Sequence, residues 1–183
     1  MFKVKLDTRA VAYIALFVAM QIVLEALFKV IPGQPQGGAI TLSLLPIFLG
    51  AYLMGPEYGL IIGLTSSLLM FVLGLAQYWG PWSLLLDYVL PVTVCGVAGF
   101  FPHIKAGKFE FPIGIVIAMI LKYGSHVLSG AWLFAEYAPE GMNPWIYSLA
   151  YNFFYNFWTM VVTIIVFMLI YPRLKKAIIF IKK

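Results

Sequence analysis

Residues 144–171 read PWIYSLAYNFFYNFWTMVVTIIVFMLIY, an apolar segment without a single Asp, Glu, Lys, Arg or His. A helix needs about 20 mainly apolar residues to cross the hydrocarbon core of a bilayer, so this segment is long enough to do so. Asn143 is a candidate N-cap before Pro144, and Pro172 is expected to end the helix. We therefore predict a transmembrane helix here.

The rest of the chain has the same character. Of its 183 residues, 63% are hydrophobic, 17% aromatic and only 10% charged, whereas a soluble domain has roughly 25% charged residues. This composition excludes a water-soluble globular protein and a disordered chain. The net charge is +5, but the basic residues gather at the chain ends and in one loop. Nucleic-acid binding is therefore not expected.

Five further apolar segments precede the last one, at residues 8–31, 42–53, 57–75, 82–102 and 111–134. The second is short and contains Pro46. Every backbone polar group in lipid must be paired, and the segments are too continuous for barrel strands, whose residues alternate. The sequence thus predicts an all-α integral membrane protein, with six transmembrane helices in one compact bundle. Without repeats or linkers, residues 1–183 are expected to form a single domain.

Basic residues in the loops predict the orientation, because they are enriched on the cytoplasmic side. With both termini inside, the outer segments hold only Lys29. The inner segments then hold ten basic residues: Lys3, Lys5, Arg9, Lys105, Lys108, Arg173, Lys175, Lys176, Lys182 and Lys183. We therefore predict that both termini are cytoplasmic.

Three ionisable residues, Asp87, Lys122 and His126, lie within predicted spans, where such side chains are costly and usually functional. From the helical rise, Asp87 lies ~8 Å and His126 ~12 Å below the outer boundary. Tyr147 and Asn152 on the last span lie at ~5 and ~12 Å by the same rise. Four polar groups from three helices thus fall in the outer half of the membrane, which predicts a pocket open to the outside.

Aromatic residues gather at the same depth. A carboxylate among aromatic faces suits an organic cation, because each face attracts positive charge by ~0.5–2 kcal/mol, and flat heteroaromatic ligands also stack on such faces. The aromatic residues concerned are Tyr78, Trp79, Trp82, Trp132, Phe134, Tyr137, Trp145, Tyr147 and Tyr151.

Each feature also has a structural interpretation. Trp and Tyr form belts at membrane boundaries in proteins without a ligand. Asp87 could pair with Lys122, and His126 could serve only helix packing. The stripe of Asn152, Asn156, Thr159 and Thr163 is better explained by interhelical hydrogen bonds than by ligand contact below Asn152. Glu25 and Lys29 are spaced for a solvated ion pair of little energetic value.

Ala15 and Ala19 have the small-xxx-small spacing that lets another helix approach closely. Packing within the same chain and packing against a partner protein explain this pair equally well.

Catalytic and cofactor motifs are absent from the sequence. It has no G-x-x-x-x-G-K-[ST] phosphate loop and no Cys/His cluster for zinc. The single Cys95 cannot form an internal disulfide. We expect neither an enzyme nor a bound metal or cofactor.

Two stretches resemble one family. Residues 126–152 read HVLSGAWLFAEYAPEGMNPWIYSLAYN, and residues 86–90 read LDYVL with GVAG at 96–99. Both are similar to the thiamine-specific S components of energy-coupling factor transporters, the ThiT or YuaJ family. Ala15-x-x-x-Ala19 resembles the motif by which S components dock on their coupling protein.

This resemblance implies a prokaryotic plasma-membrane subunit that captures thiamine from outside. A transmembrane coupling protein and two cytoplasmic ATPases would power the uptake. By the same resemblance, the family's pocket carboxylate corresponds to Asp87, its histidine to His126, and its tyrosine and asparagine to Tyr147 and Asn152.

The chain departs from the family at the stacking residues. Phe134 stands where the family has a pocket tryptophan, and Trp132 lies two residues earlier on another helix face. We expect His126 and Phe134 to supply stacking faces, with Trp132 or Tyr78 nearby. Tyr88, in the LDYVL stretch, is a further candidate. The loop from Pro32 to Gly38 is a candidate lid over the outer mouth.

Other functions remain open at this point. A related vitamin or thiamine precursor could be the ligand, because Phe134 alters the expected pocket. A stand-alone carrier would transport without partners, and a structural membrane protein would bind no small molecule.

Overall fold

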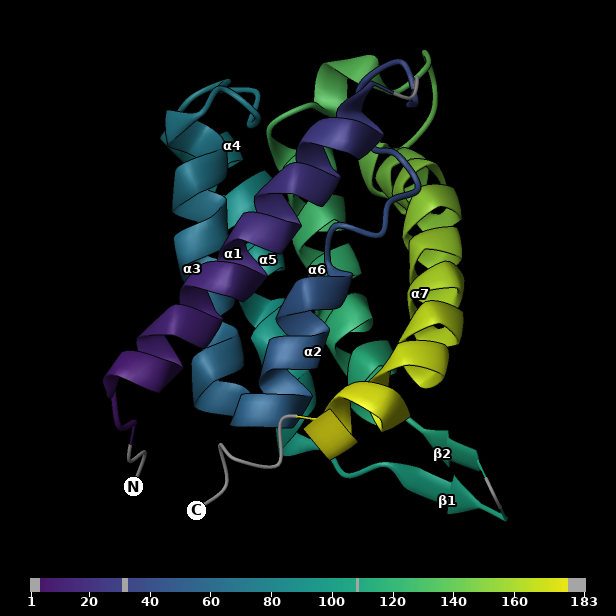
Figure 1. Cartoon of the computed structure of the whole chain (residues 1–183). Coiled ribbons are helices and arrows are strands. Elements are labelled where there is room, and N and C mark those ends of the chain that lie inside the picture. Colours follow the sequence, from purple (N-terminus) through teal and green to yellow (C-terminus); the bar gives the residue numbers. More distant parts are fainter. Residues whose placement is uncertain (1–3, 31–32, 108, 178–183) are drawn as a thin grey trace.

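The computed structural model describes residues 4–30, 33–107 and 109–177. They form a bundle of helices with one short hairpin (Figure 1). Helix α1 (Thr8–Lys29) runs the length of the bundle, and the Asp7 carboxylate caps it by accepting from the backbone N–H of Ala10 at 2.8 Å. The mainly helical prediction is confirmed.

The second passage differs from the predicted helix at 42–53. Helix α2 (Leu45–Met54) has 10 residues, or about 15 Å of helix, half the thickness of the hydrocarbon. The irregular segment 33–44 makes up the rest of this passage (Figure 1). Non-helical backbone at membrane depth is tolerated where it is buried in protein or lines a cavity. The predicted helix is therefore confirmed over residues 45–53, whereas residues 42–44 are not helical and the irregular segment before them was not predicted.

Helix α3 (Pro56–Val72) follows a turn at Gly55, whose φ of 125° favours glycine. Glycines let its backbone touch the fourth passage. A Cβ added to Gly96 would lie 2.3 Å from the carbonyl carbon of Gly59. A side chain at Gly96 would push these two segments apart, and one at Gly59 would collide first with Ala51 of α2.

The fourth passage was predicted as one helix over 82–102, and the structure divides it into four pieces. They are α4 (Pro81–Ser83), a π-helical turn η1 (Leu84–Val89), α5 (Leu90–Thr93) and the 3₁₀ segment η2 (Val94–Phe100). Pro91 explains the break, because its ring would clash with the carbonyl of Asp87 in a regular α-helix. The backbone N–H of Leu90 instead reaches Leu85 O, five residues back. Asp87 thus sits in a widened turn, a feature frequent at functional sites.

A hairpin that the sequence analysis missed connects the fourth and fifth passages. Strands β1 (Ile104–Ala106) and β2 (Phe109–Phe111) pair antiparallel, with Lys105 opposite Glu110. Helix α6 (Ile113–Trp132), the 3₁₀ turn η3 (Ala135–Tyr137) and α7 (Pro144–Ala177) complete the chain.

The expected N-cap of α7 is confirmed, because the Asn143 side chain accepts from the backbone N–H of Trp145 at 2.8 Å. The expected end at Pro172 is wrong: α7 continues to Ala177 with Pro172 inside it. Its last turns run across the end of the bundle (Figure 1). There the Arg173 side chain donates to Leu169 O at 3.4 Å.

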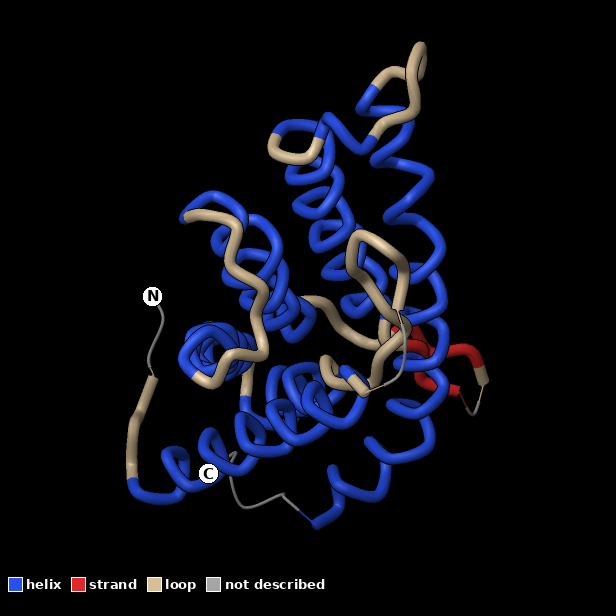
Figure 2. The backbone as a smooth tube through the Cα atoms, turned by 90° about the horizontal axis from the view of Figure 1, so that it is seen from above, coloured by secondary structure: helices blue, strands red, loops and turns tan. Residues whose placement is uncertain are grey.

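Four helical stretches are long and apolar enough to cross a membrane: Thr8–Lys29, Pro81–Phe100, Ile113–Trp132 and Pro144–Lys176. Helices α2 and α3 are apolar but shorter. Viewed from above, the helices surround the middle of the bundle and loops pass over it (Figure 2). Four large side chains of the apolar core have no exposed surface: Phe48, Ile62, Ile115 and Phe167, which come from α2, α3, α6 and α7.

Candidate functional site

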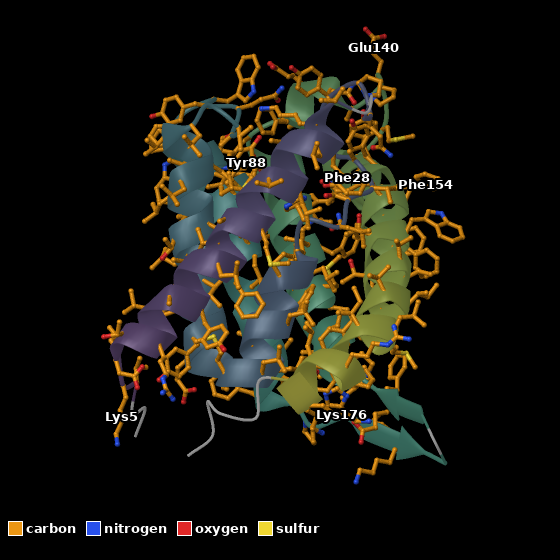
Figure 3. All side chains as sticks on the ribbon, in the orientation of Figure 1. Lys5, Phe28, Tyr88, Glu140, Phe154 and Lys176 are labelled. Atoms are coloured by element: carbon orange, nitrogen blue, oxygen red, sulfur yellow. The ribbon has the colours of Figure 1, made fainter. Side chains whose placement is uncertain are left out.

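A cavity of about 770 Å³ opens between α1, the segment 33–44, η1, α6 and α7. This volume lies within the range of small-molecule pockets. Two of its lining residues, Phe28 and Tyr88, lie in the half of the bundle that carries Glu140, away from Lys5 and Lys176 (Figure 3). The cavity therefore occupies the end of the bundle opposite the hairpin; we call this the cavity end.

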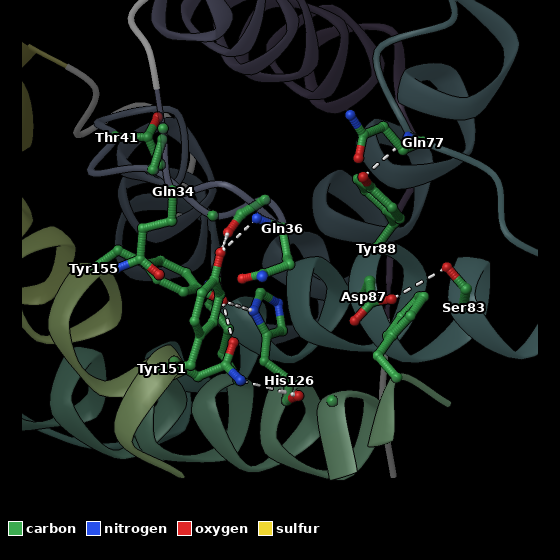
Figure 4. Close-up of a pocket in the computed structure, with 18 of the residues that line it drawn as sticks. Gln34, Gln36, Thr41, Gln77, Ser83, Asp87, Tyr88, His126, Tyr151 and Tyr155 are labelled. Atoms are coloured by element: carbon green, nitrogen blue, oxygen red, sulfur yellow. Dashed lines mark hydrogen bonds between the residues drawn. The ribbon is translucent and has the colours of Figure 1, made fainter. Parts of the chain in front are cut away.

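Six of the predicted ligand contacts line this cavity: Asp87, Tyr88, His126, Phe134, Tyr147 and Asn152. Asp87 and Tyr88 lie on one side of it, and His126 lies on the other beside Tyr151 and Tyr155 (Figure 4). The depth estimate from helical rise thus selected groups that the fold brings together.

Two predicted contacts do not line the cavity. Trp132 packs against Trp82 with ring centroids 5.7 Å apart, and Tyr78 packs against Phe71 at 5.5 Å. Both are 55% exposed. His126 and Gly130 are spaced four apart and share the face of α6 toward the cavity, and Phe134 lines the cavity from the turn just after that helix. Trp132, two residues from Gly130, therefore points away from the cavity.

Asp87 has no basic partner among the described residues, whose one ion pair joins Lys175 and Glu110 at 3.9 Å. Its Oδ2 accepts instead from the Ser83 hydroxyl at 3.1 Å (Figure 4). The predicted alternative of an Asp87–Lys122 pair is therefore wrong. The carboxylate is left with capacity to accept further hydrogen bonds from a ligand.

Lys122 is buried, lines the cavity and donates to Asn156 Oδ1 at 2.7 Å. Its ammonium also lies 5.6 Å from the centre of the Tyr155 ring. The Asn156 contact joins α6 to α7, and Thr159 Oγ1 accepts from the backbone N–H of Thr41 at 3.2 Å. The interhelical role predicted for the polar stripe is confirmed at Asn156, whereas Thr159 bonds the irregular segment 33–44 rather than a helix.

Two tyrosines of α7 hold the segment 33–38 over the cavity. The Tyr151 hydroxyl accepts from the backbone N–H of Gln36 and donates to Gly37 O, both at 2.9 Å. Tyr147 donates to Gln36 Oε1 at 3.2 Å. The segment thus forms one wall of the cavity, as a lid requires, although Pro32 of the predicted lid lies outside the described residues.

The sequence analysis named Trp79 and Tyr151 among the aromatic residues at this depth, but it missed Tyr155, Gln36 and Gln77 as lining residues. Tyr155 follows Tyr147 and Tyr151 at intervals of four, so helical spacing alone would have placed it on their face. Gln36 and Gln77 come from loops, where no periodicity predicts which side chain points inward.

Lys29 does not form the predicted pair with Glu25. Its ammonium donates to the backbone oxygens of Gly74 and Leu75, at 3.3 and 2.7 Å. The lysine thereby ties the end of α1 to the loop after α3. Both Glu25 and Lys29 line the cavity, at its rim.

Ala15 and Ala19 lie exposed on α1, next to the exposed Leu16 and Met20. Packing of this pair against the described part of its own chain is therefore excluded. The small-residue face of α1 is open to lipid or to another protein.

The described residues contain no group of three His, Cys, Asp or Glu side chains placed to hold a metal ion. Cys95 is buried, and its thiol donates to Pro91 O at 3.2 Å.

Comparisons with known proteins identify the family and the fold of this chain. The model of the family described as "Thiamine transporter protein (Thia_YuaJ)" matches residues 11–179. The thiamine transporter ThiT of Bacillus subtilis is 33% identical over 149 residues, which are 76% of this chain and 78% of that protein. ThiT of Lacticaseibacillus paracasei is 29% identical over 105 residues, 51% of each chain.

Two solved structures share the fold. ThiT from Listeria monocytogenes superposes with a TM-score of 0.77 at 19% identity, covering 94% of this chain and 99% of that one. The S component of a bacterial ECF transporter superposes with a TM-score of 0.62 at 21% identity, covering 96% and 98%. With nearly all of its length matched by the family model, this chain belongs to the thiamine transporter (Thia_YuaJ) family.

Proposed function

We propose that this protein is the membrane subunit that captures thiamine from outside the cell for ATP-driven uptake by an energy-coupling factor transporter. Family membership supports the substrate. The observation that carries the proposal is one cavity, of single-ligand size, that brings an unpaired Asp87 together with His126, Tyr147 and Asn152. As a member of a transporter family with several membrane-spanning helices, it is a multi-pass protein of the bacterial plasma membrane.

Thiamine combines a cationic thiazolium ring with a neutral aminopyrimidine. Asp87 supplies a negative charge in a low-dielectric setting, where charge attraction is stronger than in water. Tyr88, Phe134 and Tyr151 offer ring faces on which a flat cation stacks favourably. Phe134 would thus supply the stacking face that a tryptophan supplies at this position in the family.

Hydrogen bonds would give the site its selectivity. Asn152 Oδ1 accepts one hydrogen bond from Tyr155 and keeps a second lone pair toward the cavity. Tyr147 can exchange its contact with Gln36 for a ligand contact. An analogue that lacks a matching group would leave a buried polar atom unpaired, which costs about 1–3 kcal/mol.

The distribution of charge supports the orientation. Lys5 and Lys176 lie at one end of the bundle and Glu140 at the other (Figure 3). Helix α1 begins and α7 ends at the basic end (Figure 1). Under the positive-inside rule, both termini are cytoplasmic and the cavity opens to the outside, with the segment 33–38 as its lid.

Energy for uptake would come from partners. The chain has no phosphate loop, so we assign ATP hydrolysis to two cytoplasmic ATPases and its transmission to a transmembrane coupling protein. Ala15 and Ala19, exposed on α1, are the docking surface we propose for that protein. The chain itself, as one domain over residues 1–183, binds rather than catalyses.

A thiamine titration of the purified chain in detergent tests this function. Trp79 lines the cavity, so a stacking ligand should quench tryptophan fluorescence saturably at micromolar concentration or below. Asp87→Asn should weaken binding at least tenfold, because hydrogen bonds to charged groups contribute about 1.5–3 kcal/mol. Glu140→Gln, which removes a carboxylate outside the cavity, is the matched control and should bind normally.

Reconstitution separates this function from the alternatives. Liposomes that hold this chain alone should bind thiamine without net transport. Transport by the chain alone would identify a stand-alone carrier. No response to millimolar thiamine from folded protein would exclude thiamine and favour another cationic vitamin or precursor.

A further inference from the structure

Tyr155 lies behind the predicted ligand contacts, where α7 meets α6 and the segment 33–38. It is 6% exposed, and Gly38 packs flat against its ring. A Cβ added to Gly38, whose φ is 91°, would lie 2.6 Å from Tyr155 Cε1. The ring is therefore fixed in place, and its hydroxyl sits between Asn152 and His126.

The amide of Asn152 has one possible orientation. Its Nδ2 donates to Ser148 O at 2.9 Å and to Ser148 Oγ at 3.1 Å. A backbone carbonyl only accepts hydrogen bonds. The Ser148 hydroxyl donates its one hydrogen to Val127 O at 2.9 Å, so toward Asn152 it can also only accept. The Asn152 amide nitrogen must therefore face Ser148, and Oδ1 faces Tyr155.

This orientation fixes the proton of Tyr155. The phenol carries one hydrogen, and Asn152 Oδ1, 2.6 Å away, can only accept it. The Tyr155 oxygen must therefore accept from its other neighbour, His126 Nδ1, at 2.5 Å (Figure 4). His126 Nδ1 thus carries a hydrogen.

The other ring nitrogen of His126 is left as an acceptor. Nε2 is buried and has no hydrogen-bond partner among the described residues. No carboxylate forms an ion pair with His126 there, and an unpaired buried charge is costly, so the ring is neutral. A neutral ring with hydrogen on Nδ1 presents a bare lone pair at Nε2. His126 lines the cavity, so a ligand atom that reaches Nε2 there must be a hydrogen-bond donor.

We propose that Tyr155 is a positioning residue that holds His126 in the Nδ1–H tautomer, and that Nε2 thereby selects ligands with an N–H donor at this point of the cavity. The inference rests on the proposed function and deepens it. In thiamine the exocyclic amine of the pyrimidine is the donor. A pyrimidine with a carbonyl in place of that amine would set two lone pairs against each other.

Nitrogen NMR of histidine tests the tautomer without any ligand. The chain has two histidines, and a His103→Gln variant assigns their signals. At neutral pH, His126 should show a protonated, pyrrole-type Nδ1 and an unprotonated, pyridine-type Nε2. The opposite pattern, or an imidazolium, would overturn the proposal from the wild-type protein alone.

A pair of variants tests the role of Tyr155. Tyr155→Phe removes the acceptor for Nδ1–H, so the two tautomers should mix and the two nitrogen signals should converge. Tyr123→Phe is the control: its hydroxyl donates to Leu149 O at 2.9 Å between the same two helices but outside the cavity. That variant should keep the wild-type spectrum. An unchanged spectrum in Tyr155→Phe would show that Tyr155 does not set the tautomer.

Binding measurements test selectivity. The preference of the wild-type chain for thiamine over its carbonyl analogue should fall about tenfold in Tyr155→Phe, the scale of one hydrogen bond. It should persist in Tyr123→Phe. Equal weakening of both ligands would overturn the selective role. If the wild-type chain shows the expected tautomer but binds neither compound, the proposed function fails while the tautomer assignment stands.

Discussion

The two ends of this bundle are built in opposite ways. At the end near the hairpin, which we call the packed end, side chains such as Phe48 and Phe167 have no exposed surface, and Gly59 and Gly96 bring two backbones into contact. At the cavity end, an irregular segment replaces half of a helix, and Asp87 has no basic partner. The comparison teaches that tight packing at one end lets the helices part at the other without loss of the fold.

The largest effect is expected from breaking the packed end. Gly96→Ala would place a Cβ 2.3 Å from the Gly59 backbone, and overpacking of a rigid contact costs about 1–3 kcal/mol or more. Thermal unfolding in detergent should show a clearly lowered Tm. Gly124→Ala is the matched control, because a Cβ there meets nothing within 4 Å. It should leave Tm unchanged or raise it, since alanine favours helix by up to about 1 kcal/mol. Equal effects of the two changes would mean that the glycine contact is unimportant.

A change at the lid should affect binding more than stability. Gly38→Ala combines a φ of 91° with a clash against Tyr155, whereas Gly37→Ala, at φ 98°, has open space for its Cβ. In both variants an alanine must adopt a positive φ, which costs about 1–2 kcal/mol because its Cβ crowds the backbone. Only Gly38→Ala should also displace the lid and weaken thiamine binding by more than tenfold. Titration of both variants measures the difference, and equal affinities would argue against contact between lid and ring.

The tyrosine contacts allow a finer comparison within the cavity end. Tyr151→Phe removes two hydrogen bonds to the lid backbone, and Tyr147→Phe removes one to a side chain. At about 1 kcal/mol each, thiamine should dissociate roughly thirtyfold faster from the first variant and about fivefold faster from the second. Stopped-flow displacement measures both rates. A faster release from Tyr147→Phe would instead assign that hydroxyl to the ligand.

The smallest effect is expected at Trp132. It packs outside the cavity against Trp82, so Trp132→Phe should change thiamine affinity less than twofold, within the scatter of surface substitutions. Trp79→Phe, at a position that lines the cavity, should remove most of the fluorescence response. A large loss of thiamine affinity in Trp132→Phe would instead show that Trp132 contributes to the binding site.

The sequence predicted the parts of this molecule that follow from a rigid helical rise. A rise of 1.5 Å per α-helical residue placed Asp87, His126, Tyr147 and Asn152 in the outer half of the membrane, and all four line the cavity. Trp132 was kept as a nearby candidate although it was placed on another helix face than Phe134, and the structure shows that it packs on Trp82 outside the cavity.

Other features depend on tertiary contacts that no local pattern encodes. Helix α2 is short because the segment 33–44 is held by α7, and the turn around Asp87 widens because of Pro91. The role of Tyr155 arises from two partners on different helices. The role of such a residue can be recognised only once the structure shows which residues surround it.

A structure of the chain with thiamine bound tests the central claim most directly. The account predicts thiamine in the cavity, with its cationic ring against Asp87 and its exocyclic amine within hydrogen-bond distance of His126 Nε2, beneath the closed segment 33–38. Thiamine bound elsewhere, or bound in the cavity without contact to either residue, would contradict it.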